Sequence, residues 1–201
     1  MNDFVVIGLT GPSGAGKSTV ARELERQGCR VVDCDRIARE ITDTCQPCLK
    51  ELAAEFGGDI LQEGKLDRKL LARRAFSSRE REKRLNAIIH PWILAQADRE
   101  IESYRKDGIR FVILDAPLLI EAGADRKCGF ILAVTAPEEI RAERVMRRDG
   151  ISLEETKRRF SVQHEESFYT ERANAVIDGS RSLEEIAENI ARILKKLRDN
   201  G

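Results

Sequence analysis

Aromatic residues are scarce in this sequence, and neither sign of charge exceeds the other. Phe, Tyr and Trp make up 5% of the 201 residues, and 35 Lys and Arg balance 35 Asp and Glu, so the formal net charge is zero. Proteins that stack bases on aromatic side chains, or bind nucleic acid through overall positive charge, have a different composition. We therefore expect no nucleic-acid partner, although a local basic patch remains possible.

Long hydrophobic runs are also absent. The longest, Phe4–Leu9 and Phe111–Leu114, are far shorter than the roughly 18 apolar residues of a membrane-spanning helix. The first three residues lack the positive flank of a secretory signal peptide. From these features we expect a cytoplasmic protein with no membrane partner.

Cysteines are few and odd in number. Of the five, two form the C-x-x-C segment Cys45-Gln46-Pro47-Cys48. No second pair of Cys or His stands at the spacing of a zinc site. We expect reduced thiols, and neither a metal site nor a redox pair in this segment.

What the sequence does contain is an alternation of short apolar runs with amphipathic segments. Five of the apolar runs are predicted to be strands: Phe4–Leu9, Val31–Asp33, Phe111–Leu114, Phe130–Thr135 and Ala175–Ile177. Strands that alternate with helices imply right-handed crossovers and a parallel sheet covered on both faces. Because the chain is too short for two ordinary domains and shows no linker, we expect one domain over residues 1–201 with a three-layer α/β fold.

The helices show explicit start and stop signals. The segment 17–27 is predicted to be a helix that ends before Gly28, a residue typical of helix C-termini. Segments of the S/T-x-x-E type, which have the pattern of a capping box, begin at Thr135, Ser152 and Ser182.

A long helical stretch separates the second and third predicted strands. From about residue 36 to 105 the pattern is helical with no convincing strand, which predicts a helical insertion beside the sheet. Within it, Pro91 stands between two helical patterns, 78–89 and 92–105, and predicts a helix junction at His90-Pro91. The run Arg79–Arg84 is interpreted as a solvated helix surface.

The strongest functional signal is a P-loop. Residues 11–18 read Gly-Pro-Ser-Gly-Ala-Gly-Lys-Ser and match G-x-x-x-x-G-K-[ST], between a predicted strand and a predicted helix. Loop amides and the helix N-terminus favour phosphate, Lys17 supplies charge to the outer phosphates, and the Ser18 hydroxyl can bind Mg²⁺. The nucleotide-binding residues are predicted to be Gly11, Ser13, Gly14, Ala15, Gly16, Lys17, Ser18 and Thr19.

Acidic residues follow two of the predicted strands. Asp33 and Asp35 come at the end of the second strand, where ligands of open parallel sheets bind. Either could accept a proton from an attacking hydroxyl, but Asp35 could equally cap a helix beginning at Arg36. Asp115 ends the third strand as a Walker-B-like acid near Mg²⁺ would, the alternative being a surface acid.

Four arginines crowd the helix predicted to begin near Pro137. Arg141, Arg144 and Arg148 share one face and could close over transferring phosphates. Glu139 is interleaved with them, so the pattern by itself favours a solvated, salt-bridged face.

Several blocks together resemble the dephospho-CoA kinase family over nearly the whole chain. The P-loop is shared by many families, whereas the ordered set of blocks is specific. They are Gly8–Gly11 before the P-loop, Val32–Arg39, Leu85–Pro91, Asp115–Glu121, Val134–Glu138 and Arg172–Asp178.

The resemblance implies phosphorylation of the ribose 3′-hydroxyl of dephospho-CoA by ATP with Mg²⁺, the last step of coenzyme A synthesis. It implies that Asp35 is the catalytic base and that Lys17 and Arg144 act on the phosphates, with Arg144 on a helical lid over residues 137–170. Metal binding would fall to Ser18 and Asp115. The acceptor would be bound by the insertion and by Asp35, Arg39, His90, Pro117 and Leu118.

The sequence departs from the family pattern at three points. Pro12 follows Gly11 where the family usually has a second glycine, and Ile120 stands where it favours Phe. The usual Asn-x-Gly after the last strand is replaced by Gly179-Ser180-Arg181, a change that bears on how the adenine of ATP is held.

Two other functions compete with this interpretation. Another P-loop kinase of small molecules, acting on a nucleoside or nucleotide, predicts the same ATP site but a different acceptor insertion. A guanine-specific switch or a mechanical ATPase predicts N-K-x-D or L-S-G-G-Q segments, and the chain contains neither.

Overall fold

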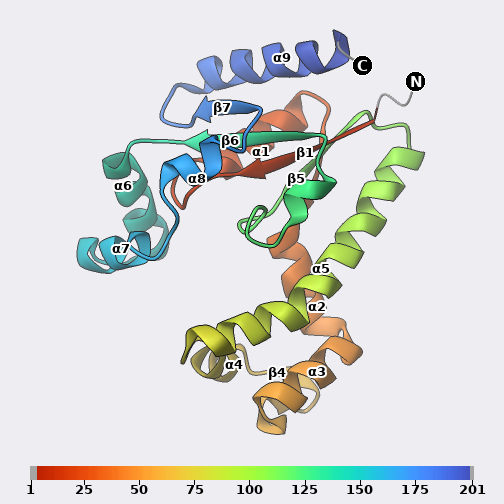
Figure 1. Ribbon diagram of the computed structural model, residues 1–201, viewed down its shortest axis with the longest axis vertical. Coiled ribbons are helices and arrows are strands. Elements are labelled where there is room, and N and C mark those ends of the chain that lie inside the picture. The colour runs from red at the N-terminus through yellow and green to blue at the C-terminus, as the bar shows by residue number, and fades with distance from the viewer. Residues whose placement is uncertain (1–3, 200–201) are drawn as a thin grey trace. The chain divides into compact units, whose positions relative to one another are not determined.

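The computed structural model describes residues 4–199, and the chain divides into two compact units (Figure 1). The first, here called the sheet unit, is formed by the residues up to Val32 and from Ile101 onward. The second, the helical unit, is Asp33–Glu100. The chain therefore passes between the units twice.

The sheet unit is built on a five-stranded parallel sheet, as the alternation of strands and helices predicts. The strand order is β2-β5-β1-β6-β7. The strands are β1 (Val5–Thr10), β2 (Arg30–Asp33), β5 (Phe111–Asp115), β6 (Phe130–Thr135) and β7 (Ala175–Asp178). All five lie where apolar runs of the sequence predicted them, within a residue or two at each end.

The register of the sheet places chemically important residues at one edge. In the parallel pairing of β1 with β5, Leu9 lies opposite Asp115, and in that of β1 with β6, Thr10 lies opposite Ala133. The carboxyl end of β1, which opens into the P-loop, is therefore level with Asp115.

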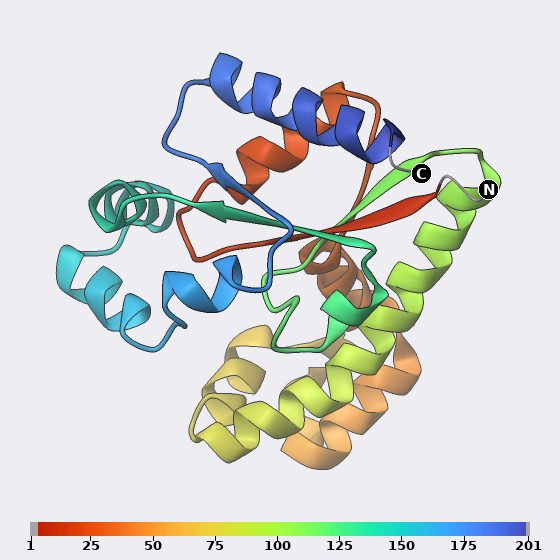
Figure 2. The ribbon, with the colours of Figure 1, turned by 45° about the horizontal axis from the view of Figure 1, so that its top comes forward.

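One face of the sheet is covered by α1 (Lys17–Arg26) and α9 (Leu183–Asp199), as Figure 2 shows. Apolar side chains of both helices pack on the strands in a single buried cluster that includes Leu24, Ile190 and Ile7. On the other face a Cβ at Gly8 would lie 2.6 Å from Leu119, in the segment that joins β5 to β6. That segment contains the short 3₁₀ helix η2 (Ala124–Lys127).

Three further helices follow β6 in the sheet unit. They are α6 (Glu138–Asp149), α7 (Leu153–Phe160) and α8 (Glu166–Thr170). The capping boxes expected at Ser152 and Ser182 are present, since each serine hydroxyl accepts from the amide three residues on. The one expected at Thr135 is wrong: β6 continues through Thr135, and Pro137 caps α6 without a side-chain hydrogen bond.

The helical unit consists mainly of helices around its own buried residues. Its elements are α2 (Cys34–Thr44), α3 (Gln46–Phe56), η1 (Gly58–Ile60), β3 (Leu61–Gln62), β4 (Lys65–Leu66), α4 (Arg68–Ala75) and α5 (Arg79–Lys106), the last of which continues into the sheet unit. Leu49, Leu52 and Ile60 are fully buried.

Two local expectations for this stretch are wrong. A two-residue antiparallel hairpin, β3 with β4, occurs where no strand was expected; its turn is made by Glu63 and Gly64, both with positive φ, as tight hairpins require. The junction expected at His90-Pro91 is also absent, because α5 runs through Pro91. Pro91 deprives the carbonyl of Ala87 of its helical partner, and exposure of Ala87 lets water replace it.

No helix within residues 4–199 is both long enough and apolar enough to cross a membrane. Across the same residues, no group of three or more His, Cys, Asp or Glu is placed to hold a metal ion. All five cysteines are free thiols, and Cys48 of the C-x-x-C segment is fully buried.

The packing of α9 yields a stability prediction. Leu194 is 1% exposed in the core cluster, whereas Leu183, on the same helix, is 62% exposed. We expect Leu194→Ala to lower the free energy of unfolding by about 2–5 kcal/mol, because it removes buried methyl groups and leaves a cavity. The matched variant Leu183→Ala is expected to change it by about 0.5 kcal/mol or less. Urea denaturation of both measures the difference, and similar losses would contradict the assignment of this face of α9 to the core.

Candidate nucleotide and acceptor sites

The P-loop joins β1 to α1 with the geometry of an anion-binding turn. Gly11, Gly14 and Gly16 have φ values of 139°, 81° and 105°, which favour glycine. Helix α1 begins at Lys17 after Gly16, with no side-chain cap and no acidic residue in its first turn. The positive end of the helix is therefore left to an anionic ligand.

The loop is closely packed by backbone from three directions. A Cβ at Gly11 would collide with the carbonyl oxygen of Val134 at the end of β6, and one at Gly14 would lie 2.5 Å from the carbonyl oxygen of Arg141 in α6. A Cβ at Gly179, just after β7, would collide with the carbonyl oxygen of Ala15. Gly11 and Gly14 are therefore required by space as well as by conformation, and Gly179, whose φ is not positive, by space alone.

Arg144 is hydrogen-bonded to the P-loop itself. Its Nη1 donates to the carbonyl oxygens of Gly14 at 3.2 Å and Ala15 at 3.4 Å, and its Nη2 donates to that of Gly179 at 2.8 Å. The structure thus joins Arg144 to the predicted nucleotide-binding residues. It also shows that this arginine belongs to the support of the loop rather than to the solvated face that the pattern favoured.

The loop side chains are held by polar contacts within the sheet unit. The Nζ of Lys17 donates to the carbonyl oxygens of Gly11 at 2.7 Å and of Pro12 at 3.4 Å. The amide of Ser13 donates to Oε1 of Gln163 at 3.4 Å. Gln163 lies between α7 and α8, in a polar stretch with no motif that could have identified it from the sequence.

Oxygen donors suited to Mg²⁺ stand at the same edge of the sheet. Ser18 lies in the first turn of α1 and Asp115 ends β5, next to β1. A hydroxyl and a carboxylate, completed by phosphate oxygens and water, are the ligands that Mg²⁺ prefers. In addition, the Thr10 hydroxyl is fully buried and has no hydrogen-bond partner among residues 4–199. It offers a further polar atom where the loop begins.

The loop after β7 is ordered by Asp178. Its carboxylate accepts from the amide of Ser180 at 2.9 Å and from Nε of Arg181 at 3.0 Å. These hydrogen bonds hold the pKa of Asp178 below its usual range, and those from Ser180 contribute most to this lowering. The Gly179-Ser180-Arg181 segment is therefore a defined turn beside the P-loop, although it lacks the asparagine usual in the resembling family.

In the helical unit, the two acidic residues of the D-x-D block have different positions. Asp33 caps α2: its Oδ1 accepts from the amides of Asp35 at 2.8 Å and Arg36 at 3.0 Å. The capping alternative considered for Asp35 is therefore wrong, because Asp33 performs that role and Asp35 stands in the first turn.

Asp35 lines a cavity of about 380 Å³ formed entirely by the helical unit. We call it the acceptor cavity. It is lined by Asp35, Ala38, Arg39 and Thr42 of α2, by Leu66, Arg68, Leu71 and Ala72, and by Phe76, Leu85 and Ile89. Charged groups thus share the cavity with a largely apolar wall.

Of the predicted acceptor residues, Asp35 and Arg39 line this cavity, whereas His90 is not among its lining residues. Burial lowers the pKa of His90, so its imidazole is neutral at pH 7. Pro117 and Leu118 lie in the sheet unit, where Leu118 is 43% exposed.

Sequence reasoning missed Phe76 and Arg68. Phe76 follows α4 and is 63% exposed, and Arg68 is hydrogen-bonded to Asp43 of α2 at 2.8 Å. A large apolar residue between two helical patterns was the available signal for Phe76.

Comparison with known proteins gives one consistent family. The family model for dephospho-CoA kinase matches residues 5–185. A dephospho-CoA kinase of Corynebacterium jeikeium is 39% identical over 187 residues, covering 93% of this chain and 96% of that protein. One of Bacillus licheniformis is 36% identical over 191 residues, covering 94% and 95%.

Solved structures agree. The crystal structure of TT1252 from Thermus thermophilus has a TM-score of 0.82 and 36% identity, covering 96% of this chain and 98% of that one. Dephospho-CoA kinase from Campylobacter jejuni (TM-score 0.63, 24% identity) covers 97% and 98%. Shikimate kinase from Acinetobacter baumannii (TM-score 0.54, 18% identity) covers 99% and 96%. The last two show likeness of fold.

The packing around the P-loop yields a prediction for nucleotide binding. We expect Gly179→Ala to weaken ATP binding by about 10-fold or more, because the added methyl must displace the Ala15 carbonyl and the loop with it. Gly129→Ala is the matched control, since its nearest contact would be Val5 at 3.6 Å and its φ is likewise not positive. Calorimetric titration with ATP measures both, and equal affinities would contradict the close packing.

Proposed function

The chain belongs to the dephospho-CoA kinase family, and from this we infer that its sheet unit holds ATP while its helical unit binds the acceptor. The reaction transfers the γ-phosphoryl group of ATP to the ribose 3′-hydroxyl of dephospho-CoA, giving coenzyme A and ADP. The observation that carries the division of roles is that the P-loop and the cavity lined by Asp35 lie in different units.

For the nucleotide, we propose that residues 11–19 surround the phosphates. The amides of the loop and of the first turn of α1 bind phosphate oxygens, and Lys17, whose Nζ is already at the loop, supplies positive charge. Arg144 holds the carbonyls of Gly14 and Ala15 and places a second positive charge on the loop. Both charges favour the transition state, in which negative charge lies on the phosphoryl oxygens.

The residues at the edge of the sheet fit Mg²⁺. We propose that Ser18 and Asp115 hold it, because both offer oxygen atoms next to the P-loop. When bound, Mg²⁺ would neutralise part of the negative charge of the phosphates.

For the acceptor, we propose that Asp35 orients the 3′-hydroxyl and takes its proton. Arg39 has no ion-pair partner among residues 4–199 and lines the same cavity, so we assign it to the diphosphate of dephospho-CoA. The apolar wall, with the exposed ring of Phe76, suits the uncharged parts of the acceptor. Neutral His90, Pro117 and Leu118 remain proposed acceptor residues.

The remaining proposals concern motion and location. Helices within residues 137–170 are proposed as a lid, because α6 carries several arginines whose mutual repulsion bound phosphates would relieve. Free thiols at all five cysteines suit a reducing compartment, which supports a cytoplasmic location.

The assignment of dephospho-CoA as the acceptor is tested by comparing turnover with different acceptors. Release of ADP, measured in a coupled assay, is expected to be negligible with ATP alone and to rise with dephospho-CoA. Nucleosides, nucleotides and shikimate are expected to give little turnover. Faster turnover with a nucleoside than with dephospho-CoA would favour a different small-molecule kinase, and turnover without acceptor would favour an ATPase.

The division of roles between Asp33 and Asp35 gives a sharper prediction. We expect Asp35→Asn to lower kcat by about 100-fold or more, because the amide keeps the shape but cannot take the proton. Asp33→Asn keeps an oxygen that can accept from the amides of α2, so kcat is expected to fall by only a few-fold. Steady-state kinetics of both variants, with ATP binding checked by titration, measures the contrast. If Asp33→Asn is inactive while Asp35→Asn retains its rate, the base has been assigned to the wrong carboxylate.

A further inference from the structure

The chain is neutral overall but carries one strongly basic segment. Residues 73–84 contain six basic and two acidic side chains: Arg73, Arg74, Arg79, Arg81, Lys83 and Arg84 against Glu80 and Glu82. From the sequence, the second half of this segment was interpreted as a solvated helix surface. Residues 79–84 are all exposed in the structure, as that interpretation predicts, and Arg81 among them also lines a cavity.

This second cavity of the helical unit, which we call the arginine cavity, has a volume of about 620 Å³. It is lined by Ala54, Glu55 and Phe56 of α3, by Gly57, by Arg73 and Arg74 of α4, by Ser77 after that helix, and by Arg81 of α5. It shares no lining residue with the acceptor cavity. A volume in this range fits a small molecule.

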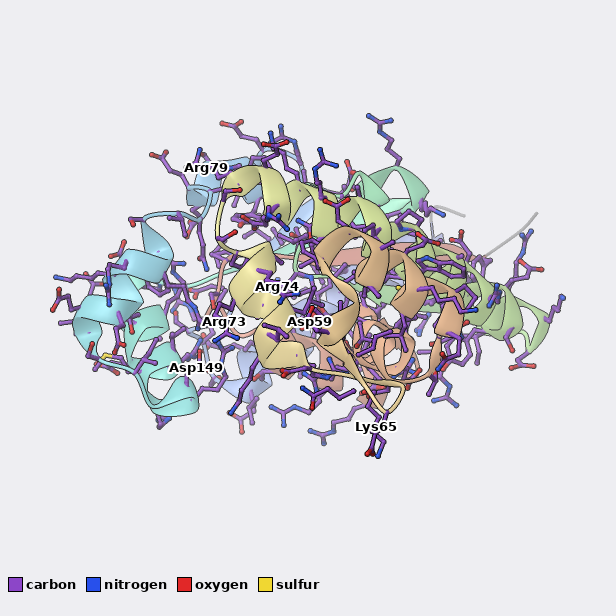
Figure 3. All side chains as sticks on the ribbon, turned by 90° about the horizontal axis from the view of Figure 1, so that it is seen from below. Asp59, Lys65, Arg73, Arg74, Arg79 and Asp149 are labelled. Carbon is purple, nitrogen blue, oxygen red and sulfur yellow. The ribbon has the colours of Figure 1, made fainter. Side chains whose placement is uncertain are left out.

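Arg74 forms the fixed side of the arginine cavity. Its Nη1 and Nη2 donate to the two carboxylate oxygens of Asp59, both at 2.6 Å, and Nη1 also donates to the carbonyl oxygen of Phe56 at 2.6 Å. The hydrogen bond from Arg74 lowers the pKa of Asp59, as expected for a carboxylate paired with a guanidinium. Figure 3 shows Arg74 facing Asp59, with Arg73 nearby and Arg79 well apart.

Arg73 and Arg81 leave positive charge in the cavity. Within residues 4–199 neither guanidinium has an acidic partner, and that of Arg81 lies over the ring of Phe56, 5.9 Å from its centroid. The acidic lining residue, Glu55, is 3.6 Å from Arg84, which is outside the lining. Two arginines without counter-charge therefore line one concave site.

We propose that the arginine cavity is a binding site for the phosphate or diphosphate group of a small molecule, distinct from the P-loop and from the acceptor cavity. Planar guanidinium groups match the oxygens of phosphate in paired hydrogen bonds, and Arg is favoured over Lys where such geometry is used. The fixed Arg74 and the Phe56 ring hold the shape of the site, while Arg73 and Arg81 supply the charge. The small concave volume and the scarcity of aromatic residues favour a metabolite over nucleic acid.

Different residues of α4 line the arginine cavity and the acceptor cavity. Arg68, Leu71 and Ala72 of this helix line the acceptor cavity, whereas Arg73 and Arg74 line the arginine cavity. A ligand in one cavity therefore does not occupy the other. The name of the acceptor cavity depends on the proposed function. The proposal of an anion site in the arginine cavity does not depend on it.

The test is a titration of the intact protein with sodium diphosphate at constant ionic strength, followed by amide hydrogen exchange. Peptides that cover residues 73–84 report the arginine cavity, those that cover 8–20 report the P-loop, and those that cover 34–45 report the acceptor cavity. We compare wild type with Arg73→Gln/Arg81→Gln. The matched control is Arg79→Gln/Arg99→Gln, which removes the same charge from exposed arginines outside the lining.

In wild type and control, diphosphate is expected to slow amide exchange in residues 73–84. The midpoint concentrations of diphosphate, which give half of this effect, are expected to agree within twofold. In Arg73→Gln/Arg81→Gln the midpoint is expected to rise at least 10-fold, with protection of the P-loop peptides unchanged. Absence of protection at 73–84 in wild type, or an equal rise in both double variants, would overturn the proposal. The proposal would also be overturned if residues 34–45 were the only residues outside the P-loop that diphosphate protects.

Kinase activity without added diphosphate separates this result from the assignment of function. Turnover of dephospho-CoA by Arg73→Gln/Arg81→Gln is expected to stay within about threefold of wild type, because these arginines line neither the acceptor cavity nor the P-loop. A tenfold loss with unchanged circular dichroism would place them in the acceptor site and overturn the proposal of a distinct site. Failure of the wild type to use dephospho-CoA would count against the function alone.

Discussion

The architecture of the sheet unit depends on the close approach of backbone to the P-loop. Three glycines, Gly11, Gly14 and Gly179, let the loop contact β6, α6 and the turn after β7 at distances that exclude any side chain. The loop is thus held open in the shape of an anion site before any ligand arrives. Preorganised donors of this kind lower the barrier without reorganising during the reaction. Arg144 completes the support by hydrogen-bonding the loop carbonyls.

The sheet and the P-loop could be predicted from the sequence because their signals are local. Each buried strand is a short run of β-branched and other apolar residues, and the P-loop motif joins a strand to a helix in the order that its chemistry needs. The continuity of α5 through Pro91 could not be predicted. It depends on the exposure of Ala87, which is a property of the folded molecule.

The roles of charged residues were harder to assign for the same reason. Two aspartates spaced by one residue are equivalent in sequence, and the direction in which the chain turns after β2 makes Asp33 the cap of α2. The arginines of α6 form a charged helical face by their spacing, but Arg144 reaches the P-loop because α6 packs against Gly14. Phe76 and Gln163 carry no motif at all, so contacts alone identify them.

The place of α4 between two cavities has a thermodynamic consequence. Residues of this one helix line both cavities, so ligands of the two cavities act on the same eight-residue segment, Arg68–Ala75. By linkage, whatever factor an occupant of one cavity imposes on the affinity of the other is returned in equal measure. An anion that tightened or loosened the hold on the acceptor would itself be retained or released as acceptor became abundant. Through this short helix, the fraction of enzyme that holds acceptor would then depend on the concentration of the anion, and the fraction that holds the anion would depend on the concentration of acceptor.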